Sequence, residues 1–278
     1  MKNGLTAVKN IIWALAIMVA LLALLIGLVF SVATKYYGNS MDGTLVLGQA
    51  VRPAADSKVD NVGMDASAPA GAVLELPSTQ DNGIEAVFNF TFLCDSTIVG
   101  VNDYSASYGG NAKANLWTDN GSGLSAANAA TTTIVYPGDG SLITPSNAAM
   151  VAQPKRIVIY IGGDDLAAAN EQSFKAGYTQ LINSLRSASP ESKIICSTVA
   201  SVSSAYPGSD GLNKELIASA NNWIKDVSIQ TGTYFCDLAA QLNGDDGYLK
   251  DEFASPDGRS LSAAGIAKIV EFFRYHGI

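Results

Sequence analysis

The chain has 278 residues, of which 48% are hydrophobic and 15% are charged, and its formal net charge is −8 at neutral pH. This length suits one sizeable domain with additional segments rather than several large domains. The acidic chain carries no cluster of Lys and Arg residues, so nucleic acid is not expected as a partner.

The first recognisable segment is apolar. Residues 11–33 contain no charged side chain, and as a helix they are long enough to cross a hydrocarbon core of about 30 Å. Lys2 and Lys9 precede the segment and favour an N-terminus on the cytoplasmic side. We therefore expect a short cytoplasmic segment at 1–10, a single-pass anchor whose partner is the lipid bilayer, and an extracytoplasmic remainder. A cleaved signal peptide ending at the small residues 31–33 is the alternative.

Residues 34–80 are rich in Gly, Ala, Ser, Asp and Pro and show no long apolar period. This composition is typical of a flexible extracytoplasmic stalk. Short strands within it, at Thr44–Leu47 or Ala72–Leu76, remain open. We place the folded domain at residues 81–278.

Within that domain, apolar strand-like runs alternate with helix-like stretches, which favours a parallel sheet with helices on both faces, a three-layer α/β/α fold. The expected strands are Ala86–Leu93, Ala112–Trp117, Arg156–Ile161, Lys193–Val199 and Thr233–Cys236. The expected helices are Thr97–Tyr108, Pro145–Ala152, Glu171–Ala188, Leu212–Gln230 and Ser262–Tyr275. Residues 131–144 interrupt this alternation and suggest a hairpin-like insertion.

The three cysteines, Cys94, Cys196 and Cys236, lie in or beside apolar, strand-like runs. Their spacing does not match a metal site, and an odd number allows at most one disulfide. We expect buried free thiols.

Ligands of parallel α/β sheets bind at the carboxyl ends of the strands, so the residues that follow each strand are the candidate site. Ser96 follows the first strand, Gly121 the second and Asp164 the third, and Asp257 lies in a turn before the last helix. The order and spacing of these residues along the chain resemble the motif pattern of the SGNH (GDSL-type) esterase family. The resemblance implies a flavodoxin-like fold in which Ser96 is the nucleophile, Asp257 is the second catalytic residue, and Ser96 and Gly121 bind the oxyanion.

Three positions depart from the pattern of that family. Cys94 stands where the family usually has Gly, Asp164 replaces an Asn that donates to the oxyanion, and Ser260 replaces the histidine that acts as base. An ionised Asp has no hydrogen to donate and carries the wrong charge for an oxyanion hole. The only histidine, His276, lies about 24 Å from the site if it belongs to the same helix as Ser262.

These departures leave three functions open. The first is a degenerate, inactive domain that binds a cell-envelope glycan or acyl ligand. The second is an active serine esterase or acyltransferase that uses Ser96 on acylated extracellular carbohydrate. The third is a cation-binding module built from Asp95, Asp164, Asp165 and Asp257, since clustered carboxylates suit Ca²⁺ or Mg²⁺. The resemblance itself implies neither a metal nor another cofactor.

Overall fold

The computed structural model describes residues 71–98, 100, 115–119 and 123–278. The expected cytoplasmic segment, the apolar segment at 11–33, most of the expected stalk and Gly121 lie outside these ranges. Among the helices of the described ranges, none has the length and apolar character needed to cross a bilayer.

A six-stranded sheet forms the centre of the domain, in the order β1-β8-β7-β6-β2-β3, and every pairing within it is parallel. The central strands β2, β6 and β7 are almost wholly buried, as expected for a parallel sheet covered on both faces. The strands are β1 (Leu74–Glu75), β2 (Phe90–Cys94), β3 (Leu116–Trp117), β6 (Arg156–Tyr160), β7 (Lys193–Ser197) and β8 (Tyr234–Cys236).

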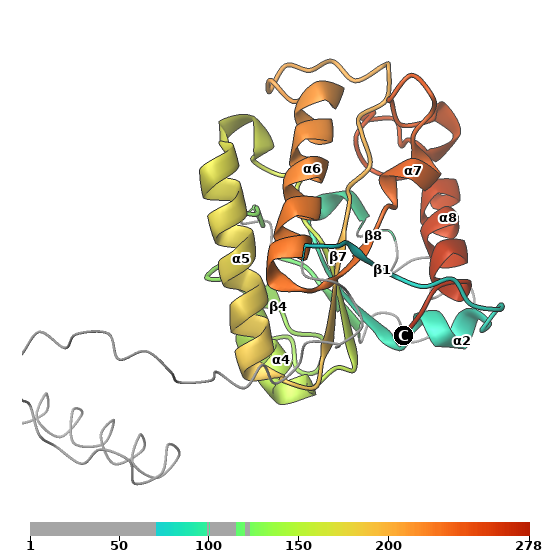
Figure 1. Cartoon of the computed structure of the whole chain (residues 1–278). Coiled ribbons are helices and arrows are strands. Elements are labelled where there is room, and N and C mark those ends of the chain that lie inside the picture. Colours follow the sequence, from blue (N-terminus) through green and yellow to red (C-terminus); the bar gives the residue numbers. More distant parts are fainter. Residues whose placement is uncertain (1–70, 99, 101–114, 120–122) are drawn as a thin grey trace, which may run out of the picture. The chain divides into compact units, whose positions relative to one another are not determined.

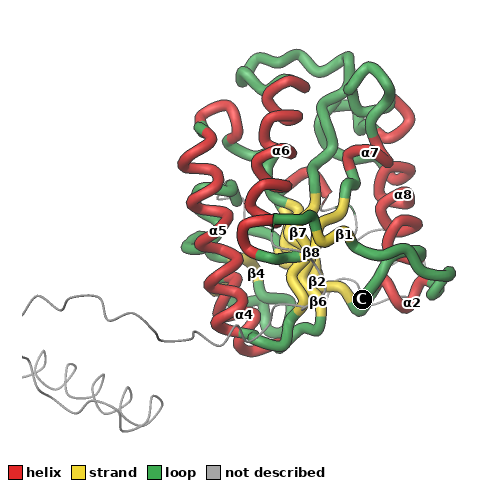
Figure 2. Tube along the Cα trace, viewed as in Figure 1, coloured by secondary structure: helices red, strands yellow, loops and turns green. Residues whose placement is uncertain are grey.

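Helices flank the sheet on both sides, which confirms the three-layer α/β/α prediction (Figures 1 and 2). On one side lie α5 (Glu171–Ala188) and α6 (Lys214–Thr231), and on the other lie α2 (Ile84–Val87) and α8 (Ala263–Arg274). Within the described residues, the remaining helices are α4 (Pro145–Ala152), α7 (Ala239–Leu242) and the short 3₁₀ turns η1 (Ser96–Ile98), η3 (Leu166–Ala168) and η4 (Asp251–Phe253).

The expected hairpin-like insertion is present as two antiparallel strands, β4 (Ile134–Val135) and β5 (Leu142–Ile143). Immediately after it, the Thr144 side chain accepts a hydrogen bond from the Asn147 N–H and caps α4. Pro145 occupies the first turn, where its missing N–H has no partner to lose.

Two segments differ from the sequence-based expectation. The strand expected at Ala86–Leu93 begins only at Phe90, because residues 84–87 form the helix α2. A short apolar run does not by itself distinguish strand from helix. The other difference is the start of the domain: the strand left open at Ala72–Leu76 is present as β1, which pairs with β8 although it precedes residue 81. Of the helix expected at Thr97–Tyr108, only its start is described, as the turn η1.

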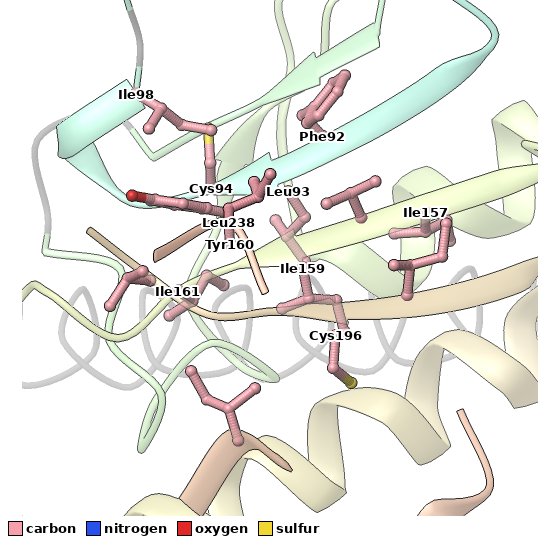
Figure 3. Close-up of a cluster of buried hydrophobic side chains, with 14 of the residues drawn as sticks. Phe92, Leu93, Cys94, Ile98, Ile157, Ile159, Tyr160, Ile161, Cys196 and Leu238 are labelled. Atoms are coloured by element: carbon pink, nitrogen blue, oxygen red, sulfur yellow. The ribbon is translucent and has the colours of Figure 1, made fainter. Parts of the chain in front are cut away.

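The core under the site is apolar and contains the cysteines. Figure 3 shows Cys94, at the end of β2, beside Ile98 of η1. All three cysteines are free and buried, which confirms the expectation of buried thiols. Burial raises the pKa of Cys94 well above its usual range and raises the pKa values of Cys196 and Cys236 to about 12.

Candidate functional site

Asp95 fixes the two turns that carry the site. It lies directly after β2 and is fully buried. One carboxylate oxygen accepts hydrogen bonds from the backbone N–H groups of Gly162 and Gly163, at 3.2 and 2.9 Å. The other accepts from the N–H and hydroxyl of Thr97. Burial and then the neighbouring Asp164 charge raise the pKa of Asp95. Asp95 therefore joins the end of β2 to the end of β6 and holds Ser96 opposite Asp164.

Ser96 and Asp164 are in direct contact. The Ser96 hydroxyl donates to Asp164 Oδ1 at 3.0 Å, and the Ser96 backbone N–H donates to Asp164 Oδ2 at 3.1 Å. Both groups that the family resemblance assigns to catalysis, the nucleophilic hydroxyl and an oxyanion-binding N–H, thus point at a carboxylate of the chain itself.

The third member of this cluster is Arg259, whose guanidinium forms an ion pair with Asp164 Oδ1. The pair is partly sheltered, since the side chain of Asp164 is 12% exposed and that of Arg259 is 25% exposed. The Arg259 Nε is buried and has no hydrogen-bond partner within the described residues. The sequence interpretation gave Arg259 no role, because its partner Asp164 lies 95 residues earlier in the chain and no spacing pattern links the two.

Asp257 and Ser260 pair with each other. Asp257 Oδ1 accepts from the backbone N–H groups of Arg259 and Ser260, both at 2.9 Å, and Oδ2 accepts from the Ser260 hydroxyl at 2.6 Å. Burial pushes the pKa of Asp257 upward, but the Ser260 hydroxyl, the two N–H groups and the Arg259 charge outweigh it, so the pKa is lowered. Asp257 therefore shapes its own turn.

That turn contacts the Ser96 turn on one side and the segment after β7 on the other. The Leu261 N–H donates to the Thr97 carbonyl at 3.1 Å. Gly258 adopts the left-handed conformation, with φ +72°, and a Cβ there would lie 2.9 Å from the Ser203 hydroxyl. Both contacts hold the turn that carries Arg259, and it is Arg259 that lies beside Asp164.

The chain's single imidazole lies at the far end of α8. His276 forms hydrogen bonds with the Ser78 hydroxyl and the Phe272 carbonyl, at 3.2 and 2.8 Å, and it stacks on the Phe272 ring. The helix between it and the capping residue Ser262 is about 18 Å long. His276 is held by local contacts and is not placed to take a proton from Ser96.

A cavity of about 410 Å³ opens beside Ser96. Its described lining carries four carboxyl groups and one guanidinium, on Asp119, Asp164, Asp165, Asp210 and Arg259. The Tyr206 hydroxyl and the Leu212 N–H donate to Asp210 and lower its pKa, so this group is ionised at neutral pH. The cavity therefore presents mainly hydrogen-bond acceptors and negative charge.

Two other predicted positions are placed as follows. Cys94 is fully buried in β2 and does not line the cavity. Gly121 lies outside the described residues, whereas Gly123, two residues later, lines the cavity. The carboxylates of the cation hypothesis are divided among separate partners, and no group of three or more His, Cys, Asp or Glu residues in the described ranges could hold a metal ion.

Several solved structures resemble the domain in their fold. A GDSL-like lipase from Bacteroides thetaiotaomicron aligns with a TM-score of 0.46 at 14% identity, covering 66% of this chain and 83% of the lipase. A carbohydrate esterase of family 3 from Talaromyces cellulolyticus aligns with a TM-score of 0.44 at 15% identity, covering 66% and 92%. An acetyl esterase variant with an acetate ion aligns with a TM-score of 0.43 at 14% identity, covering 66% of this chain and 92% of the esterase.

Comparison with curated protein sequences gives no match. The sequence profile of the GDSL-like lipase/acylhydrolase family, however, matches residues 92–267. This range begins in β2, immediately before Ser96, and extends into α8, so it includes the Ser96, Asp164 and Arg259 cluster. The chain therefore belongs to the GDSL-like lipase/acylhydrolase family.

Proposed function

We propose that this chain is a membrane-anchored, extracytoplasmic member of the family that has lost ester hydrolysis and binds a neutral cell-envelope glycan in the cavity beside Ser96. The observation that carries the proposal is the Ser96–Asp164–Arg259 cluster. In it, the serine hydroxyl donates to an ion-paired carboxylate instead of an imidazole.

Two arguments support the loss of hydrolysis: Ser96 lacks a base to accept its proton, and a negative charge lies beside it. A serine hydroxyl needs a base to become a nucleophile, and removing the base of a serine triad typically lowers kcat by about 10⁴–10⁶-fold. The oxyanion formed on attack needs donors, yet the Ser96 N–H already donates to Asp164. The Asp164 carboxylate also lies where negative charge would develop, and this raises the barrier further.

The lining of the cavity supports a neutral, hydroxyl-rich ligand. Sugar hydroxyls donate hydrogen bonds, and the carboxylates of Asp119, Asp165 and Asp210 accept them. The exposed side chains of Ala167 and Ala168 offer a small apolar surface for the C–H face of a sugar ring. An anionic ligand would meet an excess of negative charge, so neutral glycans are favoured over acidic ones.

An active esterase is the second candidate, and one contact favours it. The Ser96 hydroxyl lies 3.0 Å from Asp164 Oδ1, within reach for direct proton transfer to the carboxylate. Carboxylates are weak bases for an alcohol, and this one already forms an ion pair with the Arg259 guanidinium. Any such activity is therefore expected to be slow and to depend on Ser96.

One experiment separates the two candidates. The full chain in detergent micelles is assayed for hydrolysis of p-nitrophenyl acetate and, by calorimetry, for binding of the neutral trisaccharide chitotriose. We expect hydrolysis equal to that of the Ser96→Ala variant, and fewer chitotriose molecules bound per chain in Ala167→Trp than in the parent, since Ala167 is exposed and lines this cavity. Hydrolysis lost on Ser96→Ala would establish the esterase, and binding unaffected by Ala167→Trp would reject the glycan site.

The anchor is tested separately. Residues 11–33 are apolar throughout, so the full chain should remain with membranes during carbonate extraction, and a chain lacking residues 1–33 should not. Release of the full chain by carbonate would reject the anchor without affecting the proposal for the Ser96 cavity.

A further inference from the structure

A second cavity, of about 510 Å³, lies at the carboxyl ends of β7 and β8. The helix α6 forms one wall, and α7 with the turn after it forms the other; both helices are labelled in Figure 1. Among the described residues, none lines both this cavity and the one beside Ser96. The carboxyl edge of a parallel sheet is where α/β folds bind ligands, so this α6–α7 cavity stands at a position suited to binding.

One of the residues that line the cavity carries a buried polar group without a partner in the described part of the chain. Ser201 is 2% exposed, and its Oγ has no hydrogen-bond partner in the described part of the chain. Its backbone N–H, in contrast, donates to Asn243 Oδ1 at 3.1 Å, so the residue is fixed in place. An unpaired buried hydroxyl is unfavourable and calls for a partner that the protein does not supply.

The charges around the α6–α7 cavity indicate the chemistry of that partner. Lys214 and Lys225 lie on the same face of α6, about 16 Å apart along the helix, and Asp237 and Asp245 lie on the other wall. Asp237 is oriented by the Thr198 hydroxyl and the Ala240 N–H, at 2.8 and 3.1 Å. Two ammonium groups and two carboxylates give no net formal charge, so neither an anion nor a cation is favoured.

The remaining polar groups suit a ligand that both donates and accepts. Asn222 and Asn243 present amides to the cavity, and an amide has donors and an acceptor in one group. Ala218, exposed between the two lysines, leaves the wall of α6 open at its centre. We propose that the α6–α7 cavity binds a neutral sugar unit, with the Ser201 hydroxyl as a buried hydrogen-bond partner.

The test uses the full chain in detergent micelles and saturation-transfer NMR with N-acetylglucosamine as the probe. All samples carry Ala167→Trp, which blocks the Ser96 cavity, so the result does not depend on the function proposed for that cavity. We expect the sugar signal to persist in this background, to vanish when Ala218→Trp is added, and to weaken about threefold to tenfold in affinity with Ser201→Ala. Circular dichroism verifies that each variant is folded.

Three outcomes would overturn the proposal. They are absence of the sugar signal in the Ala167→Trp chain, a signal that Ala218→Trp leaves unchanged, and binding of glucuronate in place of N-acetylglucosamine. The last would show that Lys214 and Lys225 recruit an anion. The two tryptophan variants are matched, since each replaces an exposed alanine that lines one cavity only, so failure at one site is distinguishable from failure at the other.

Discussion

Neutralising Asp164 tests the cluster on which the proposed function rests. Asp164→Asn keeps the shape and one acceptor oxygen, so a contact with Ser96 can persist, but it removes the charge paired with Arg259. Solvent-exposed ion pairs contribute about 0–1 kcal/mol, whereas loss of one partner of a buried pair costs about 3–5 kcal/mol. The side chains of Asp164 and Arg259 are 12% and 25% exposed, so this pair lies between an exposed and a buried ion pair. We therefore expect Asp164→Asn to lower the free energy of unfolding by about 2–3 kcal/mol.

The matched control is Asp165→Asn, which removes the same charge one residue later. Asp165 is exposed and has φ +55°, a conformation that Asn tolerates, so its replacement should change stability by no more than about 0.5 kcal/mol. Urea unfolding followed by circular dichroism measures both variants. A double-mutant cycle with Arg259→Met should give a coupling of about 1–3 kcal/mol. Equal effects of the two Asn variants, or a coupling near zero, would refute the ion pair.

Three further predictions concern the turn that carries Arg259. Ser260→Ala removes the hydroxyl that helps lower the pKa of Asp257, and a lowered carboxyl pKa stabilises the fold above about pH 4. In urea unfolding the variant should therefore lose under about 1 kcal/mol of stability at pH 7, and its difference from the parent should disappear as the pH falls below about 4. A difference that stays constant with pH would exclude this linkage. Gly258→Ala should lower the melting temperature far more than Gly140→Ala, since both have φ above +70° but only at Gly258 does a new Cβ meet another atom, at 2.9 Å; similar losses would contradict this. Ser260→His combined with Asp164→Asn supplies a base beside Asp257 and restores an amide donor, so esterase activity on p-nitrophenyl acetate should appear; a folded, inactive double variant would argue against the alignment with the family.

The long helices and the central strands were predictable because nearby residues determine where each of them begins and ends. Pro145 sets the first turn of α4, and α5 ends two residues before Pro190, as the missing N–H of proline requires. The central strands are continuous apolar runs of the kind that only a doubly covered parallel sheet buries. The alternation of such elements was sufficient for the fold class.

Other features depended on contacts between distant segments. β1 has only two residues and pairs with β8, about 160 residues later, so the sequence could leave a strand at Ala72–Leu76 open but could not place it in the sheet. The position of Arg259 is decided by the left-handed Gly258 and by the Leu261 contact to Thr97. Spacing alone aligned Ser260 with the family histidine, but it could not show that the neighbouring arginine reaches Asp164.

The most direct measurement of the central claim is the intact mass of the full chain after incubation with a fluorophosphonate. A serine activated by a base forms a covalent phosphonyl adduct, whereas a hydroxyl that only donates to an ion-paired carboxylate does not. The Ser96–Asp164–Arg259 cluster predicts an unmodified mass. An adduct that appears in the parent chain and is absent from Ser96→Ala would contradict it.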